Sequence, residues 1–271
     1  MCYYHTMEVK MDITPWEKVK LARMPVRPTS LDYIERIFDN FLEMHGDRFF
    51  GEDRAIVGGI AFFGNIPVTI IAQQKGRNTK ENITRNFSMP HPEGYRKALR
   101  LMKQAEKFHR PIINFIDTPG AFCGLGAEER GQGEAIATNL AQMMLLKTPI
   151  ISVVISEGGS GGALALGVAD KVYMLEHAIY AILSPEGFAS ILYKDSTKAE
   201  QAARDMKLTA QDLLHFGIID GIIPEPQGGA HNDFDHMAQN IKTVIEADLQ
   251  DLLQLSTQEM LDKRYHKFRK M

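Results

Sequence analysis

The sequence predicts a single α/β domain in which helices cross over between the strands of a sheet. Two short apolar runs, Ile112 to Ile116 and Ile150 to Ile155, have the length and composition of buried strands. A glycine-rich loop and then a helical pattern follow each run. Such folds bind ligands in the loops at the carboxyl ends of their strands, so we expect the functional site at these two loops.

The other segments agree with this class, and each has a local signal. A helix is expected from Thr29 to Leu42, with Thr29 or Ser30 as its cap. Gly64-Asn65 separates two β-rich runs and indicates a hairpin. Further helices are expected at about 94–109, 134–146, 198–206 and 233–255, and further short strands at 171–175 and 178–182. Residues 1–10 show no periodicity and are interpreted as an unstructured N-terminal tail, which leaves 11–271 as one domain.

Composition and charge argue against several classes of protein. The 271 residues carry a formal net charge of -3, which gives no global positive field for nucleic acid or an anionic membrane. Cys2 and Cys123 are too few for a disulfide framework or a four-thiolate zinc site, so we expect a reducing cytoplasm and no metal in this chain. No apolar run approaches the roughly 20 residues of a membrane span, and no secretion signal is visible.

The strongest local feature is the segment Gly158-Gly159-Ser160-Gly161-Gly162, between a buried strand and a helix. Backbone N–H groups at such a helix start can stabilise a negatively charged oxygen, and glycine permits close approach. The same letters also match G-x-S-x-G, which makes Ser160 a candidate hydrolase nucleophile. Asp220 with His231 or His236 would complete a triad in the required chain order. A tight turn without chemistry is the third alternative.

A second glycine-rich segment, from Asp117 to Gly126, leaves the other buried strand. Two such loops on adjacent strands would face one cavity. Asp117 is either a catalytic carboxylate or, as strand-end aspartates more often are, an Asx-type turn residue. Cys123 has no basic neighbour in the loop, so we interpret it as a small filler and not as a nucleophile.

One basic concentration stands out between the hairpin and the third helix. Its members are Lys75, Arg77, Lys80, Arg85, Arg96, Lys97 and Arg100. Arginine and lysine in such a group could meet the phosphates of a nucleotide-bearing substrate such as coenzyme A, but a solvated charged face is an equal alternative. The sequence has no Walker A pattern and no dinucleotide fingerprint, so ATP or NAD binding is not expected.

A set of sequence runs, in order along the chain, resembles the carboxyltransferase alpha-subunit family of bacterial acetyl-CoA carboxylases. These runs are Asp53–Ile60, Gln74–Arg77, Asn86–Pro90, Pro92–Ala98, Phe115–Ala121, Gly126–Gln132, Glu157–Ala163, Ser184–Gly187, Ile223–Pro226 and Gly228–His231. The resemblance extends from about Ile13 to Tyr265. One departure is Phe122-Cys123, where the family usually has Tyr-Pro, and it puts the stiffness of that loop in doubt.

The resemblance implies a ClpP/crotonase-like spiral of ββα units and the transfer of a carboxyl group from carboxybiotin to acetyl-CoA, which forms malonyl-CoA in the first committed step of fatty acid biosynthesis. It implies that Gly161 and Gly162 form the oxyanion hole for biotin, and that Gly120, Ala121 and the segment Gly158-Gly159 line the biotin side of the cavity. Implied partners are a beta subunit in an α2β2 assembly, the biotin carboxyl carrier protein and biotin carboxylase. Zinc is implied only for the beta subunit. The alternatives are a crotonase-fold serine hydrolase that uses Ser160 and a non-catalytic assembly subunit.

Overall fold

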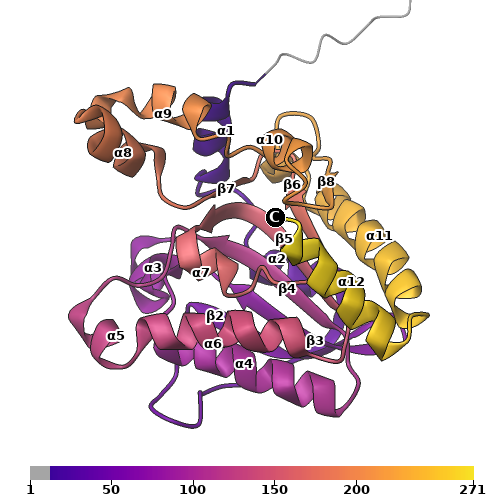
Figure 1. The fold of residues 1–271 in the computed structure, drawn as a ribbon. Coiled ribbons are helices and arrows are strands. Elements are labelled where there is room, and N and C mark those ends of the chain that lie inside the picture. Colours follow the sequence, from indigo (N-terminus) through magenta and orange to yellow (C-terminus); the bar gives the residue numbers. More distant parts are fainter. Residues whose placement is uncertain (1–12) are drawn as a thin grey trace, which may run out of the picture.

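A mixed sheet of eight strands forms the centre of the computed structural model, which describes residues 13–271 (Figure 1). Its strands are β1 (Asp39–Glu43), β2 (Ile56–Phe63), β3 (Ile66–Gln73), β4 (Ile112–Thr118), β5 (Ile150–Gly159), β6 (Lys171–Leu175), β7 (Ile179–Ala181) and β8 (Gly221–Ile223). The order is β1-β2-β3-β4-β5-β6-β8, and β7 pairs with the end of β5. β1 pairs antiparallel with β2, and β2 pairs antiparallel with β3. From β3 onward, neighbouring strands are parallel. The predicted α/β class is confirmed.

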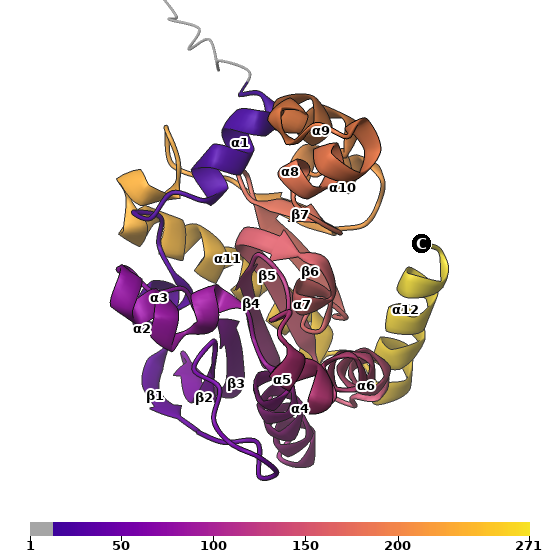
Figure 2. The same cartoon turned by 90° about the vertical axis from the view of Figure 1, so that its left-hand side faces the viewer.

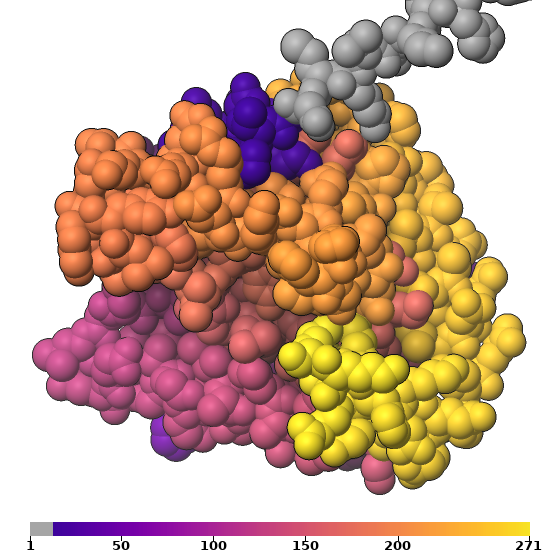
Figure 3. Space-filling model, turned by 45° about the horizontal axis from the view of Figure 1, so that its top comes forward, coloured from indigo at the N-terminus to yellow at the C-terminus, as the bar shows by residue number. Residues whose placement is uncertain are grey.

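Helices cover both faces of the sheet (Figure 2). They are α1 (Pro15–Ala22), α2 (Ser30–Ile37), α3 (Thr79–Thr84), α4 (Pro92–Lys107), α5 (Leu125–Glu129), α6 (Gln132–Leu145), α7 (Ser160–Leu164), α8 (Pro185–Phe188), α9 (Ala199–Asp205), α10 (Ala210–His215), α11 (Phe234–Leu253) and α12 (Thr257–Arg269). α4 and α6 pack together on one face with α12 beside α6, whereas α2 and α11 lie on the other face. α1 packs against α9, and in Figure 3 this indigo helix lies against the orange lobe of α8 to α10.

The two buried strands appear where their apolar runs predicted them. Every residue of β4 is buried, and β5 is buried except at Glu157 and Gly159. Parallel strands with helices on both faces have no solvent-facing side, which explains why both runs are apolar except at Asn114 and Ser152, two buried polar side chains that hydrogen-bond to each other. The predicted hairpin is also confirmed, because β2 and β3 pair in register from Ile56–Gln73 to Phe63–Ile66, and Gly64 has the positive φ of +58° that the turn needs.

The helix predicted from Thr29 to Leu42 is wrong in its second half. It begins as expected, with a capping box between Thr29 and Asp32, but it ends at Ile37. Residues 39–43 form β1, which pairs with β2 through Asp39–Phe62 and Leu42–Ile60. Pairing with the edge of β2 satisfies backbone groups of this segment, so the tertiary contact overrides the helical spacing of its apolar residues.

Among the helices that were not predicted, α1 and α12 carry a clear local signal. α1 begins with a capping box between Thr14 and Glu17, and α12 begins with one between Ser256 and Glu259. The long C-terminal helix predicted at 233–255 is α11, which Asp233 caps. The proposed N-terminal tail, residues 1–10, lies outside the described residues.

Candidate functional site

The two glycine-rich loops, which follow β4 and β5, lie directly against each other. An ideal Cβ atom on Gly162 would be 2.6 Å from both the Ala121 nitrogen and the Gly120 carbonyl carbon. A Cβ on Gly159 would overlap the backbone carbonyl of Pro119. Real Cβ atoms do not approach backbone so closely, so glycine at both positions allows the loops to touch. The structure therefore brings together five of the six glycine and alanine positions singled out from the sequence: Gly120, Ala121, Gly159, Gly161 and Gly162.

The sixth position, Gly158, has a packing reason of its own. Its ideal Cβ would lie 2.9 Å from Cδ2 of the Tyr180 ring, which belongs to β7. β7 pairs with the last residues of β5, from Glu157–Ile179 to Gly159–Ala181. The absence of a side chain at Gly158 therefore lets Tyr180 lie flat on the strand that leads into the loop.

The chain turns sharply from β5 into α7 at Ser160. This residue is exposed and has a φ of +52°, a left-handed conformation that is uncommon for serine. No side chain caps the start of α7. The first N–H groups of a helix have no partner within the helix, so those of Gly161 and Gly162 are available to an anion at this point.

A buried glutamine fixes this helix start to the first loop. The Gln73 side chain is fully buried at the end of β3, where its amide Nε2 donates to the carbonyl oxygen of Gly162 at 2.7 Å. Its Oε1 accepts from the backbone N–H of Asp117 at 3.1 Å. One side chain therefore holds the end of β4 and the turn of α7 at a fixed separation, which a preorganised oxyanion site requires.

Buried polar side chains also hold the turn that follows α7. The hydroxyl of Ser152 donates to the carbonyl oxygen of Leu166 at 2.7 Å, and the amide of Asn114 donates to the same oxygen at 3.1 Å. Ser152 lies on β5 and Asn114 on β4. These contacts attach the turn after α7 to the two strands that carry the glycine loops.

Next to the loops lies an ion cluster, built around the buried Asp117, that the sequence did not indicate. Lys75 Nζ is 2.6 Å from Asp117 Oδ1 and 3.1 Å from Glu157 Oε2, and Arg23 Nε donates to Glu157 Oε1 at 2.8 Å. Arg23 also pairs with Glu186 at 2.7 Å. Burial raises the pKa of Asp117, despite the opposing charge of Lys75. Burial alone would raise the pKa of Glu157 as well, but Lys75 and Arg23 outweigh it and hold that pKa below its ordinary value.

This cluster contradicts one of the two alternatives for Asp117, the turn residue. Its carboxylate pairs with Lys75 and accepts from the backbone N–H of Glu157 at 3.2 Å, so it ties the ends of β3, β4 and β5 together. The Asx-type turn is wrong. Thr118 makes the local turn contact instead, because its hydroxyl accepts from the Gly120 N–H at 3.1 Å.

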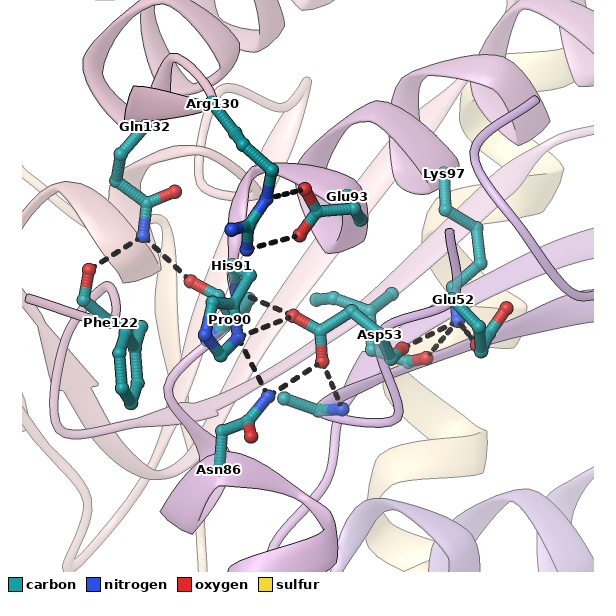
Figure 4. Close-up of polar contacts among 12 residues, drawn as sticks. Glu52, Asp53, Asn86, Pro90, His91, Glu93, Lys97, Phe122, Arg130 and Gln132 are labelled. Atoms are coloured by element: carbon teal, nitrogen blue, oxygen red, sulfur yellow. Dashed lines mark hydrogen bonds and ion pairs between the residues drawn. The ribbon is translucent and has the colours of Figure 1, made fainter. Parts of the chain in front are cut away.

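A network around Asp53 holds the outer part of the first loop (Figure 4). Asp53 accepts from the backbone N–H of His91 and from the side chain of Asn86, which fixes residues 86–91. Gln132 donates to the carbonyl oxygens of Pro90 and Phe122, each at 2.9 Å. The Phe122 ring stacks on His91 with 4.1 Å between ring centroids. This stacking anchors the loop one residue before Cys123, the position at which the sequence lacks the usual proline.

The geometry does not support the hydrolase triad. Ser160 follows the carboxyl end of β5, whereas Asp220 lies beside the amino end of β6, where it accepts from the backbone N–H of Val172 at 2.7 Å and pairs with Lys267. Ser160 and Asp220 therefore lie at opposite ends of the parallel strands. Among residues 13–271 no hydrogen bond joins Ser160 to a histidine, so the triad interpretation is wrong.

Most of the basic concentration takes part in internal ion pairs. Arg77 pairs with Asp32, Arg96 with Asp47, and Lys97 with Glu52. Arg100 donates to backbone carbonyls. Lys80 and Arg85 differ, because they line a hollow together with Arg54.

The described part of the chain also bears on metal and membrane binding. Within residues 13–271 no group of three His, Cys, Asp or Glu side chains is arranged to hold a metal ion. Over the same range, none of the helices combines the length and the apolar character needed to cross a bilayer.

Comparison with known proteins decides the family. Residues 4–271 match the family described as acetyl co-enzyme A carboxylase carboxyltransferase-like. A protein of Alkaliphilus oremlandii named acetyl-coenzyme A carboxylase carboxyl transferase subunit alpha is 63% identical over 97% of this chain and 83% of its own length. A protein of Clostridium perfringens with the same name is 65% identical over 94% of each chain. The chain belongs to this carboxyltransferase family. The resemblance inferred from the sequence is confirmed.

Solved structures confirm the crotonase-like fold predicted for the carboxyltransferase family member. The transcarboxylase 12S core, solved with methylmalonyl-coenzyme A and methylmalonic acid bound, superposes with a TM-score of 0.69 at 20% identity, over 89% of this chain and 45% of that chain. A Pseudomonas malonate decarboxylase hetero-tetramer, solved with coenzyme A, gives a TM-score of 0.64 at 18% identity, over 78% and 85% of the two chains. At these identities the likeness shows the fold alone.

Proposed function

We propose that this chain is the alpha half of a carboxyltransferase that moves a carboxyl group from carboxybiotin, on a biotin carboxyl carrier protein, to acetyl-CoA. The product is malonyl-CoA, and the wider system includes a biotin carboxylase. The observation that carries this proposal is the identity of 63% and 65% to proteins named as this subunit, over 97% and 94% of the chain. Fatty acid biosynthesis in the cytoplasm is the setting that the proposal implies.

The proposed catalytic groups are the backbone N–H groups of Gly161 and Gly162. Carboxybiotin supplies the carboxyl group, and negative charge develops on its ureido oxygen when that group leaves. N–H donors at the uncapped start of α7 would stabilise this charge without a side-chain nucleophile. The hold of Gln73 on the Gly162 carbonyl supports the assignment, because it keeps the donors in place before the reaction.

Gly120, Ala121 and the segment Gly158-Gly159 are proposed to line the biotin side of the same cavity. Gly120 has a φ of +155°, and no atom lies within 4 Å of its ideal Cβ position, so space remains beside it. Gly158 and Gly159 line a small cavity together with Pro119 and Glu157. A flat ring could approach this backbone, which supports the fit of a biotin ring to the residues present.

A second oxyanion site is needed for the thioester oxygen of acetyl-CoA, and we assign it to a beta subunit in an α2β2 assembly. This assignment predicts that the chain is inactive alone. The test is the reverse reaction, in which malonyl-CoA donates its carboxyl group to biocytin. We expect no transfer by the purified chain and transfer after addition of its beta partner. Full activity of the chain alone, in a preparation free of host carboxyltransferase, would overturn the proposal.

A further inference from the structure

A cationic hollow lies beside α3, on the surface of the protein. It has a volume of about 400 Å³ and is lined by Arg54, Asn78, Lys80, Glu81, Thr84 and Arg85. Three of these side chains are cations and one is a carboxylate. None of the six residues belongs to the glycine loops or to the ion cluster around Asp117 beside them.

The one carboxylate of the hollow is already occupied. Glu81 Oε1 accepts from the Asn78 side chain at 2.8 Å, and its Oε2 accepts from the backbone N–H of Arg77 at 2.9 Å. These contacts fold the carboxylate back onto the start of α3. Its hydrogen bond to the Arg77 backbone, followed by that to Asn78, lowers the pKa of Glu81. The carboxylate is therefore held by hydrogen bonds within its own turn and forms no ion pair with the three cations.

Within residues 13–271 none of the three cations of the hollow forms an ion pair. Arg85 donates through Nη1 to the backbone carbonyl of Arg54 at 2.9 Å, which holds its guanidinium beside that residue. Burial lowers the pKa of Arg85; the charges of Glu43 and Glu81 act against this shift, and the like charge of Arg54 adds to it. Arg54 and Lys80 are exposed, and neither side chain forms a hydrogen bond or ion pair with any of residues 13–271. Like charges in this arrangement repel, and an anion bound between them would relieve the repulsion.

The hollow is structurally connected to the glycine loops. Residues 75–88 run from Lys75, in the ion cluster at the end of β3, through α3 to the short 3₁₀ turn at Asn86–Ser88. There Ser88 donates to the carbonyl oxygen of Asp117, and Thr118 donates to that of Ser88. α3 therefore lies at the carboxyl edge of β3 and β4, the edge that carries the first glycine loop (Figure 1). An extended substrate could contact both regions.

We infer that this hollow binds the phosphate groups of the coenzyme A thioester, with Arg54, Lys80 and Arg85 as the cationic ligands. The inference deepens the proposed function and rests on it for the identity of the substrate. Arginine offers several donors in a fixed geometry, and lysine offers a point charge, so both suit phosphate oxygens. The Thr84 hydroxyl in the same wall already donates to the backbone carbonyl of Lys80 at 3.0 Å, so the neutral donor left for a further oxygen is the second N–H of the Asn78 amide, whose first N–H goes to Glu81.

The test compares the complex of this chain and its beta partner with the same complex carrying Arg54→Gln and Lys80→Gln. Neither side chain has a hydrogen-bond or ion-pair partner among residues 13–271 to lose, and the backbone carbonyl of Arg54 still accepts from Arg85. The matched control is Lys263→Gln, which removes an exposed charge from α12, on the other side of the molecule (Figure 2). Binding of coenzyme A is measured by calorimetry, and KM is measured for malonyl-CoA and for malonyl-pantetheine, which lacks the nucleotide.

We expect the double variant to raise the dissociation constant of coenzyme A and the KM of malonyl-CoA by roughly three- to tenfold at low salt. The double variant should leave the KM of malonyl-pantetheine unchanged. The control variant should leave all three quantities unchanged. Unchanged binding of coenzyme A by the double variant would overturn the inference, even if inorganic phosphate binds the hollow. Equal increases of KM for malonyl-CoA and malonyl-pantetheine would also overturn it. Calorimetry needs no turnover, so a complex that transfers no carboxyl group would refute the proposed function and still test the hollow.

Discussion

Gly162→Ala is the change that most directly tests the contact between the two glycine loops. The added Cβ would lie 2.6 Å from the Ala121 nitrogen and the Gly120 carbonyl carbon, whereas ordinary contact begins near 3.4 Å. The difference, 3.4 minus 2.6, requires the loops to separate by about 0.8 Å. Both neighbours are backbone atoms, so no side-chain rotation can relieve the overlap. Overpacking of this kind costs about 1–3 kcal/mol of stability.

The activity should fall by more than the stability suggests. A displacement of about 1 Å in a catalytic group can reduce the rate by roughly 10²-fold, and removal of one oxyanion donor costs about 10²–10³-fold. We therefore expect Gly162→Ala to lower kcat for carboxyl transfer from malonyl-CoA to biocytin by about two orders of magnitude. Thermal unfolding and co-elution with the beta partner would be measured on the same preparation, because only an assembled complex reports on the site.

Gly161→Ala is the matched control. Its ideal Cβ has ordinary contacts, of which the nearest is Ile136 Cγ2 at 3.6 Å, and alanine is favoured over glycine within a helix. We expect this variant to unfold at the same or a higher temperature and to assemble normally. The reasoning would be refuted if Gly162→Ala kept the wild-type kcat and unfolding temperature, or if both variants lost stability equally.

Two further predictions follow from the turn at Ser160 and from a buried ion pair. Ser160→Ala should change kcat by no more than about threefold, as expected for an exposed side chain without a partner, and an inactive but assembled variant would restore the nucleophile hypothesis. Arg27 Nη1 donates to Glu225 Oε2 at 2.8 Å in a fully buried pair. Burial alone would raise the pKa of Glu225, but the charge of Arg27 outweighs burial and lowers that pKa. The pair therefore stabilises the fold at pH values above 4.5, the ordinary pKa of glutamate, and this contribution is lost as the pH falls through the folded-state pKa. The difference in Tm between wild type and Glu225→Gln should therefore be large at pH 7 and shrink as the pH falls below 4.5, whereas a difference independent of pH would contradict the pairing.

The sequence determined those features whose cause is local. β4 and β5 were predicted because strands buried on both faces are apolar at most positions, and that pattern is visible in single runs of residues. The loops after them were found because only glycine tolerates backbone contact as close as that at Gly162. The starts of α1 and α12 were equally local, since Thr14–Glu17 and Ser256–Glu259 form capping boxes, and attention to that signal would have found both helices.

Other features depend on partners distant in the chain. The segment 39–43 has apolar residues at helical spacing, and only the edge of β2 makes it a strand. The buried Arg264 of α12 is balanced by Asp170, and it also donates to the carbonyl oxygen of Thr148. Neither partner is near it in sequence, so the docked position of α12 could not be read from its own residues.

The same division applies to the site. The sequence identified Gly161, Gly162 and the loop at Gly120, because a helix start rich in glycine is a local arrangement of backbone N–H groups. It did not identify Gln73 or the pairing of Lys75 with Asp117 and Glu157, which join the ends of three strands. A buried charge or amide is stable only when its partners are present, and those partners are 40 or more residues away in sequence, so tertiary structure alone selects them.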